Sequence, residues 1–457
     1  MTLKNDFATR LPALSSACLP QPAEQPSWIY FNSPLAIDLD IAQSDDWLDA
    51  LSGGTPPPGS QPIAAAYSGH QFGQFNPGLG DGRAHLLGEI ETPAGLIDLA
   101  LKGSGRTPYS RAGDGRASLG PMLREVLISE HLHALGIPTT RSLSVTATGE
   151  TVWRQQPEPG AVLARTAASH IRVGSFEHLA ARQQHEDLKQ LYRYTCERHY
   201  PDIDPDDHMA FLAAVCERQA ALIAQWMSVG FVHGVMNTDN MTLSGESIDF
   251  GPCAFMDGYD PNTVFSSIDR NGRYRYIHQP SIAQWNLTRL AETLLPLMQG
   301  EIKDNAELAK AVLNRFPAIY QDRVDHLIDQ KLGTQDEGLR QDFLQLLQDN
   351  KADWTLAFYR LSEPQDWLSL FTDQITAQQW HERWIAATPH ENRPNPAVIA
   401  RNHLVDQALK DAQGGDMRAF NTLLAELTQP HTPSSRPQAH QPADASFAAG
   451  FQTFCGT

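Results

Sequence analysis

The stretch FVHGVMNTDNMTLSGESIDFG, residues 231–251, constrains the fold of this chain more than any other segment. Asn240 follows His233 by seven positions, and the Asp249 of the triplet DFG follows the short segment MTLSGESI, which predicts a strand, a turn and a second strand. Such a hairpin would place an amide oxygen beside a carboxylate, and Mg²⁺ prefers oxygen ligands of this kind when it binds nucleotide phosphates. The stretch therefore predicts a metal site, although Asn and Asp are also ordinary turn residues.

The same spacing is typical of the catalytic segment of protein kinases, in which His-Arg-Asp is followed by four residues and an Asn. One residue departs from that template, because Val235 stands where the catalytic aspartate belongs and a valine cannot accept a proton. Asp239 is the nearest replacement, and we predict that it orients a substrate hydroxyl and takes its proton. The alternative is that Asp239 only stabilises the loop by accepting backbone N–H bonds.

A lysine and a glutamate upstream complete a second kinase-like pattern. Lys102 ends the apolar strand IDLALKG, and Glu125 lies 23 residues later (125 minus 102) on a predicted helix. A lysine that contacts nucleotide phosphates needs a carboxylate to fix its position, so we expect these two side chains to pair. A solvated helix face around Glu125 is the alternative interpretation.

A glycine-rich segment, GLGDGR at residues 78–83, precedes Lys102. Glycine lets backbone N–H groups approach a phosphate closely, but Asp81 within the segment would repel that phosphate, and glycine-rich turns are also common in hairpins. A second such segment, RAGDGR, lies between Lys102 and the helix.

The net charge of −18, from 35 basic and 53 acidic residues, argues against general binding of nucleic acid. Basic residues nevertheless gather around the expected cleft, and a bidentate guanidinium suits a triphosphate better than a polymer. Single surface arginines are common, so each is also open to a non-functional interpretation. The predicted basic array comprises Arg83, Lys102, Arg116, Arg165 and Arg172.

The composition, 41% hydrophobic and 19% charged, is that of a globular protein. Five cysteines without CxxC spacing argue against a zinc site or a secreted disulfide scaffold. The N-terminus has no apolar core of signal-peptide length, and no segment has the 18 or more apolar residues of a membrane span. We therefore expect a cytoplasmic protein with no membrane partner.

The pattern of strands, turns and amphipathic runs predicts an α+β chain with a protein-kinase-like bilobal fold. We expect a small antiparallel sheet lobe with one helix, a larger helical lobe, and extensions at both termini. The predicted boundaries are an N-terminal arm at 1–60, the sheet lobe at 61–175, the helical lobe with the catalytic loop at 176–430, and a tail at 431–457.

Three long segments resemble the selenoprotein O family: YSGHQFGQFNPGLGDGRAHLLGEI, LKGSGRTPYSRAGDGRASLGPMLREVLISEHLHALGIPTTRSL and FVHGVMNTDNMTLSGESIDFGPCAFMD. The similarity runs from about residue 25 to the terminal CGT. It implies a kinase-like fold that binds ATP in a reversed orientation with Mg²⁺ or Mn²⁺, so that AMP is transferred to hydroxyl side chains of proteins. Eukaryotic members carry selenocysteine near the end, where this chain has Cys455, as in a bacterial cysteine-containing member.

The resemblance also assigns roles to single positions. Asp239 resembles the proton acceptor of the family, and Asn240 and Asp249 resemble its magnesium ligands. Glu125 matches the ion-pair partner of the lysine. The positions that match ATP-contacting residues are Gly80, Gly82, Arg83, Lys102, Asp114, Gly115, Arg165, Arg172 and Asp249.

The sequence thus predicts a protein adenylyltransferase that uses ATP and modifies Ser, Thr or Tyr side chains, its own included. Transfer of the γ-phosphoryl group, transfer of UMP, and a non-catalytic pseudokinase scaffold are the alternatives. The presence of both metal ligands together with the Lys–Glu pair favours an enzyme over the scaffold.

Cys253, two residues after the DFG triplet, raises a question of regulation. A disulfide to Cys455 would tie the tail to this segment and could gate access to the site by redox state. Two unrelated buried thiols are the alternative.

Overall fold

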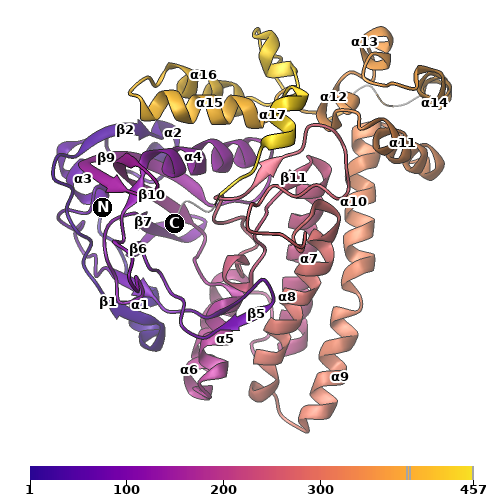
Figure 1. Cartoon of the computed structure of the whole chain (residues 1–457). Helices are drawn as coiled ribbons and strands as arrows, with labels where there is room; N and C mark the ends of the chain where they lie inside the picture. Colours follow the sequence, from indigo (N-terminus) through magenta and orange to yellow (C-terminus); the bar gives the residue numbers. More distant parts are fainter. Residues whose placement is uncertain (388–389, 391–392, 455–457) are drawn as a thin grey trace.

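An antiparallel sheet forms one side of the molecule and a group of helices the other (Figure 1). The structure, a computed structural model, describes residues 1–387, 390 and 393–454. In spatial order the sheet contains β1 (Ser15–Ala17), β3 (Ile63–Ala65), β6 (Ala84–Thr92), β7 (Gly95–Lys102), β10 (Pro157–Ala167), β9 (Arg141–Trp153) and β2 (Ser27–Phe31), with β8 (Ala117–Ser118) paired to β10. The α+β class expected from the sequence is confirmed.

The register of the central hairpin places the predicted lysine. Strands β6 and β7 are joined by a tight turn at Gly95, whose φ of +119° favours glycine. Lys102 at the end of β7 pairs with Ala84 at the start of β6, immediately after the glycine-rich segment 78–83. The lysine and that segment therefore meet at the same end of the sheet.

Helix α4 (Leu119–Ala134) lies between two layers. Its apolar side chains, among them Leu123, Val126 and Leu127, are buried, and the helix packs against β9 and β10. On its other side it packs against α15 (Asn402–Gln413) and α16 (Arg418–Leu427) (Figure 1). Because both sides are covered, Glu125 on this helix is buried as well.

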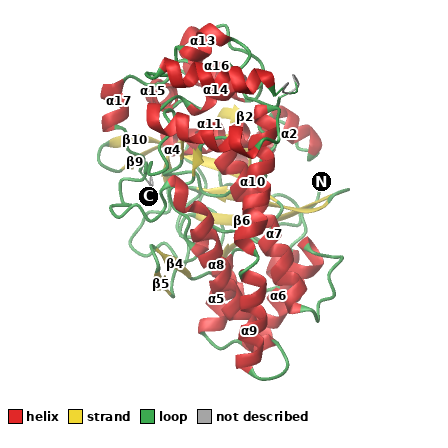
Figure 2. Ribbon diagram, turned by 90° about the vertical axis from the view of Figure 1, so that its right-hand side faces the viewer, coloured by secondary structure: helices red, strands yellow, loops and turns green. Residues whose placement is uncertain are grey.

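The larger group of helices lies on the other side of the molecule from the sheet (Figure 1), and Figure 2 views the molecule from that side, with these helices in front of the strands. This group comprises α5 (Val173–Ala181), α6 (His185–His199), α7 (His208–Ser228), α8 (Gln279–Leu294), α9 (Ile302–Leu313), α10 (Phe316–Leu332), α11 (Glu337–Asn350), α12 (Trp354–Tyr359), α13 (Pro364–Leu368) and α14 (Gln374–Ala386). Residues 1–60 add α1 (Asp6–Arg10), α2 (Ser33–Asp38) and α3 (Asp45–Leu51), and the tail adds α17 (Ala445–Gly450).

The predicted catalytic loop starts where α7 ends. A left-handed Gly230, with φ of +70°, turns the chain into β11 (Phe231–Val232), which pairs with β12 (Ala254–Phe255). This short ladder fixes both ends of the loop. Between them the expected strand-turn-strand is replaced by a turn with two single bridges, Thr242 to Arg172 and Ser247 to Thr139, because each arm pairs with a different neighbour.

A second small hairpin reaches the loop from the sheet side. It consists of β4 (Gly69–Gln71) and β5 (Gln74–Asn76), and both views place it beside α5 and α8 (Figures 1 and 2). Among the described residues, no helix combines the length and apolar character needed to cross a membrane.

Thr453, close to the last described residue, lies near the segment that contains Cys253. Thr453 forms a bridge with the chain near Ser266, and its hydroxyl donates a 2.7 Å hydrogen bond to the carbonyl of Pro252. The Cys253 thiol is buried, and burial raises its pKa to about 12. The predicted partner, Cys455, lies outside the described residues, so the disulfide stays a prediction.

Candidate active site

A cavity of about 570 Å³ opens between the sheet and the loop 233–253, a volume within the range of small-ligand pockets. Every residue that the sequence assigned to the site lines it: Gly80, Gly82, Arg83, Lys102, Asp114, Gly115, Glu125, Arg165, Arg172, Asp239, Asn240 and Asp249. A larger groove of about 890 Å³ runs between α11 and α14, but the one cation in its described lining, Arg383, is paired with Asp342. The smaller cavity is therefore the candidate site.

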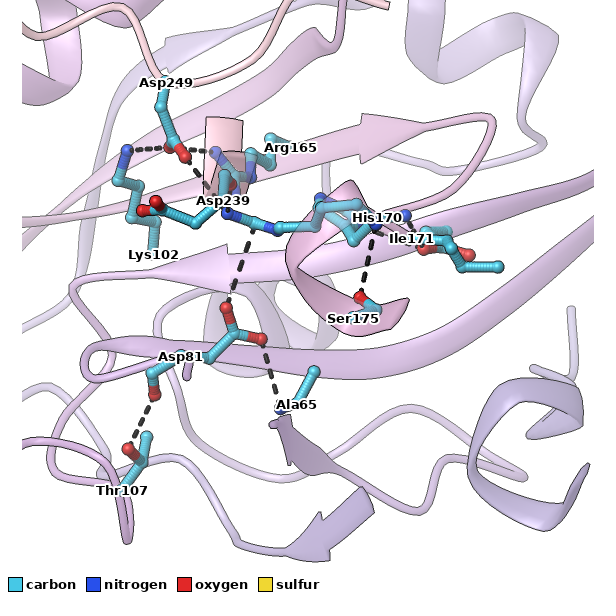
Figure 3. A network of polar contacts seen from close by, with 12 residues as sticks. Ala65, Asp81, Lys102, Thr107, Arg165, His170, Ile171, Ser175, Asp239 and Asp249 are labelled. Atoms are coloured by element: carbon cyan, nitrogen blue, oxygen red, sulfur yellow. Dashed lines mark hydrogen bonds and ion pairs between the residues drawn. The ribbon is translucent and has the colours of Figure 1, made fainter. Parts of the chain in front are cut away.

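Asp249 is the point where three cations converge. Lys102 Nζ lies 2.9 Å and Arg165 Nη1 3.0 Å from its Oδ1 atom (Figure 3), and Arg172 Nη1 lies 3.4 Å from Oδ2. Burial alone would favour the neutral carboxyl, but these cations hold the pKa of Asp249 well below its usual range. Its φ of +64° is uncommon for a residue other than glycine, and such strain is typical of functional positions.

The predicted Lys–Glu pair is formed. Lys102 Nζ donates to Glu125, and Arg165 Nη1 lies 3.8 Å from the other oxygen of the same carboxylate. Arg165 is fully buried, yet the carboxylates of Asp249 and Glu125 outweigh that burial and raise its pKa. Two carboxylates therefore hold a cationic array in place at the wall of the cavity.

Asp239 differs from the other carboxylates because it is buried with little compensation. Its Oδ2 accepts one hydrogen bond from Gln71 Nε2 at 3.3 Å, whereas Oδ1 is buried and has no partner among the described residues. Burial raises its pKa to about 6, against the attraction of Arg172, which lowers it. A carboxylate with a free oxygen and a pKa near 6 is suited to accept a proton at neutral pH.

Gly69 makes room for this carboxylate. A Cβ atom on Gly69 would lie 2.6 Å from Asp239 Oδ1, so no larger residue fits without displacing the acid. Arg172 fixes the loop itself, because its Nη1 donates a 2.7 Å hydrogen bond to the Asp239 carbonyl.

The two predicted metal ligands fit a divalent cation. Asn240 Nδ2 donates to the Val235 carbonyl at 3.0 Å, which leaves the amide oxygen directed away from that bond and without a hydrogen-bond donor among the described residues. That oxygen and the ionised carboxylate of Asp249 are hard ligands that Mg²⁺ or Mn²⁺ prefers. Within the described chain no group of three or more His, Cys, Asp or Glu side chains could hold a metal alone, so the remaining ligands would come from nucleotide or water.

Val235 and His233 have structural roles. The Val235 side chain is buried at the wall of the cavity, and its carbonyl orients Asn240. His233 is fully buried, bonds the Ile248 carbonyl through Nε2 at 2.9 Å and stacks on Trp226. His233 therefore ties the start of the loop to the residue before Asp249.

The glycine-rich segment folds against Tyr109. A Cβ on Gly80 would lie 2.4 Å from the tyrosine ring, and one on Gly82 would lie 3.1 Å from the Tyr109 carbonyl. Asp81 lines the cavity, where its Oδ2 accepts a hydrogen bond from Ala65 N at 3.2 Å (Figure 3) and its Oδ1 lies 4.0 Å from Arg172. The nearby guanidinium offsets part of the expected repulsion of phosphate.

The second glycine segment lies at the outer rim of the cavity. Asp114 is bound by Arg154 at 2.8 and 3.1 Å, which lowers the pKa of the carboxyl. Gly115 has φ of +70°, and a Cβ there would lie 2.1 Å from the Gly105 carbonyl oxygen. Arg83 and Arg116 also line the cavity, and Arg116 forms an ion pair with Glu150 at 2.6 Å.

Sequence reasoning missed three residues of this site. Gln71 binds Asp239, the Tyr67 ring lies 4.4 Å from the Arg172 guanidinium carbon, and Tyr109 packs on the glycine segment. Gln71 and Tyr67 both lie in the motif YSGHQFGQFN, for which the sequence predicted no functional residue.

Comparison with known proteins agrees with this geometry. The family model described as Protein adenylyltransferase SelO matches residues 3–428. The chain belongs to the SelO family. It is 48% identical over 494 residues to Protein nucleotidyltransferase YdiU of Rhizobium meliloti (strain 1021), covering 99% of each chain. A protein of the same description from Chromobacterium violaceum is 49% identical, covering 96% of this chain and 98% of its own, and one from Brevibacillus brevis is 46% identical, covering 99% and 97%.

Membership in the SelO family makes this chain a nucleotidyltransferase, as expected from the sequence. The family description also implies a nucleotide and a protein as substrates.

Proposed function

We propose that this chain transfers AMP from ATP to Ser, Thr or Tyr hydroxyl groups of proteins. We further propose a kinase-like bilobal arrangement, with a sheet lobe at 61–175 and a helical lobe at 176–430, in which the nucleotide is reversed. The proposal rests on one observation: a single cavity holds both a group that can accept a proton and a group of cations that can bind phosphates. Asp239 presents a buried oxygen that has no hydrogen-bond partner within the described part of the chain, and the cations around Asp249 present positive charge.

The reaction balances with these residues. The substrate oxygen attacks the α-phosphorus, the bond from that phosphorus to the leaving pyrophosphate breaks, and the hydroxyl proton passes to Asp239. Because its pKa is about 6, Asp239 is ionised at neutral pH and can accept that proton late in the transfer. The cations Lys102, Arg165 and Arg172 would stabilise the negative charge that accumulates on the phosphates.

A divalent metal held by Asn240 and Asp249 would supply Lewis-acid polarisation of the phosphate oxygens. Asp249 already carries its negative charge in the present structure, because its pKa is held low. The chain therefore does not need to lose a proton from this ligand before the metal binds.

The test is parallel incubation of the pure protein with α-labelled and γ-labelled ATP, with Mg²⁺ or Mn²⁺, read by denaturing gel and intact mass. Protein-bound label from the α position alone supports AMP transfer, and label from the γ position alone would make the enzyme a kinase with a relocated base. Competition by UTP distinguishes UMP transfer. ATP binding without any transfer would refute the proposal in favour of a scaffold.

Two variants separate the roles in that assay. Asp249→Ala should abolish transfer, whereas Asp239→Ala should slow transfer far more than it weakens nucleotide binding. Equal loss of binding in both variants would contradict the assignment of Asp239 as proton acceptor.

A further inference from the structure

The hairpin β4–β5 and the segment before α8 meet at the catalytic loop, apart from the cations that line the nucleotide cavity. The hairpin β4–β5 donates through Phe72 N to Asn237 Oδ1 at 3.1 Å, and Tyr274, which precedes α8, donates to the same oxygen at 2.6 Å. Asn237 lies two residues before Asp239. Both elements therefore border the position at which a substrate hydroxyl would bind.

This border is rich in cations and aromatic rings. The guanidinium carbons of Arg273 and Arg289 lie 4.8 and 5.0 Å from the centre of the Trp285 ring. Phe75 on the hairpin is 40% exposed, and Arg270 is exposed on the segment before α8. We call these five residues the rim surface: Phe75, Arg270, Arg273, Trp285 and Arg289.

The nearby carboxylates pair with only part of the rim surface. Asp269 uses both oxygens to accept the backbone N–H groups of Arg273 and Tyr274 at 2.8 Å each, and Glu292 pairs with Arg289 at 2.7 Å. Among the described residues no carboxylate lies within ion-pair distance of Arg273, and its buried Nε has no hydrogen-bond partner.

A further carboxylate, that of Glu177, lies on this side. Glu177 is buried below the hairpin, where it bonds His70 Nδ1 and the Thr238 hydroxyl at 2.5 Å each. Arg273 therefore lies beside the catalytic loop without an ion-pair partner among the described residues, in a chain whose net charge is −18.

We propose that the rim surface binds an acidic segment of the protein substrate, next to the hydroxyl that is modified. The inference rests on the proposed function, since it places the substrate chain over Asp239. Aromatic and arginine side chains are the residue types that contribute most to protein recognition, and guanidinium forks bind carboxylates bidentately.

The geometry also sets a spacing. Gln71 bonds Asp239, and a Cβ on Gly73, two residues further along the hairpin, would lie 3.4 Å from the Arg273 guanidinium. Two residues of an extended chain span about 7 Å, so the Arg273 guanidinium lies within a few residues' length of Asp239 along an extended substrate. Acidic residues are therefore expected within about four positions of the modified residue.

The experiment uses the full chain and three synthetic peptides of equal length with one central Thr. The residues three and four positions from the Thr, on both sides, are Asp and Glu in the first peptide, Ala in the second, and Lys and Arg in the third. Binding of fluorescein-labelled peptide is measured by polarisation, and AMP incorporation is measured separately from α-labelled ATP. The variants are Arg273→Glu and, as a control with the same change of charge, Arg323→Glu on the exposed face of α10.

The wild-type chain should bind the acidic peptide at least about tenfold more tightly than the basic one, and added salt should reduce that preference. Arg273→Glu should weaken binding of the acidic peptide about three- to tenfold, with ATP affinity unchanged, whereas Arg323→Glu should not. Equal binding of all three peptides, or equal loss in both variants, would overturn the inference. Unfolding midpoints of both variants within about two degrees of wild type show that folding is preserved, and Phe75→Ala provides a second variant at an exposed position.

Binding and transfer distinguish the two proposals. If AMP is transferred without preference for peptide charge and Arg273→Glu behaves as wild type, the docking inference fails and the adenylyltransferase function stands. If no AMP is transferred but charge-dependent peptide binding is lost in Arg273→Glu, the docking surface stands and the catalytic proposal fails.

Discussion

Replacing Asp239 by Asn should inactivate the enzyme and at the same time stabilise its nucleotide-free form. The carboxyl is 7% exposed, one of its oxygens has no partner among the described residues, and burial raises its pKa from 3.8 to about 6. Because one pH unit of displacement is worth about 1.4 kcal/mol, ionisation of this group costs the folded state roughly 3 kcal/mol at neutral pH. Asn has nearly the same shape and does not ionise, so the variant avoids that cost.

The sign of the pH dependence follows from the raised pKa. Between about pH 4 and 6 the folded protein holds a proton on Asp239 that the unfolded chain has lost, so the wild-type free energy of unfolding falls as pH rises through this interval. The advantage of Asp239→Asn should therefore be near zero at pH 4, grow through pH 5 and reach its full size of about 3 kcal/mol above pH 7.

The assay is thermal unfolding of both proteins without nucleotide at pH 4.5, 6 and 7.5. For one-step unfolding of 457 residues the entropy of unfolding is about 1 kcal/mol per degree, so the midpoint should rise by roughly 2–3 °C at pH 7.5. Asp322→Asn, on an exposed position of α10, is the matched control and should show no pH-dependent gain. A midpoint difference that is absent at pH 7.5, or equal at all three pH values, would refute the reasoning that Asp239 is a desolvated base.

Three further substitutions test other parts of the structure. Asp249→Asn should reduce transfer by at least about 1,000-fold, measured as the single-turnover rate. It should also lower the free energy of unfolding by roughly 3–5 kcal/mol, measured by thermal unfolding, because three buried cations lose a shared partner. Gly69→Ala places a methyl group 2.6 Å from Asp239 Oδ1, so transfer should slow about tenfold or more while the dissociation constant for ATP stays within twofold. Arg401→Met removes a fully buried cation that is bound at 2.5 Å to two carboxylates. The free energy of unfolding in urea should fall by roughly 3–5 kcal/mol, without a change in transfer per folded molecule. Unchanged stability would contradict the ion-pair assignment.

The sequence predicted those parts of the site that depend on local spacing. Asn240 and Asp249 were found from their positions within residues 231–251, and Lys102 and Glu125 from a strand end and a helix 23 residues later. The structure brings all four to one cavity. Local spacing is sufficient for Asn240 and Asp249 because one short loop carries both, and for Lys102 and Glu125 because only a short connection separates the end of β7 from α4.

The parts that were missed depend on contacts between distant segments. Gln71 lies 168 residues before Asp239, and the pattern of polar and apolar residues in a three-residue strand does not indicate which loop it will meet. The same holds for Arg116, which lines the cavity as the predicted array requires, but whose pairing with Glu150 could not be predicted. The sequence around an arginine in a glycine-rich loop does not show which acidic residue will lie beside it, because that depends on how the neighbouring strands are arranged.

The substitution of valine for the kinase base is consistent with a base that has moved along the loop. At position 235 the side chain is buried, and only its carbonyl is used, to orient Asn240. A carboxylate there would add a further negative charge to a cavity that already holds those of Asp239, Asp249 and Glu125, and like charges in a buried site raise one another's pKa values. An apolar residue at this position therefore helps to leave Asp239 as an acid with a pKa near 6, which is low enough to be ionised at neutral pH and high enough to accept a proton.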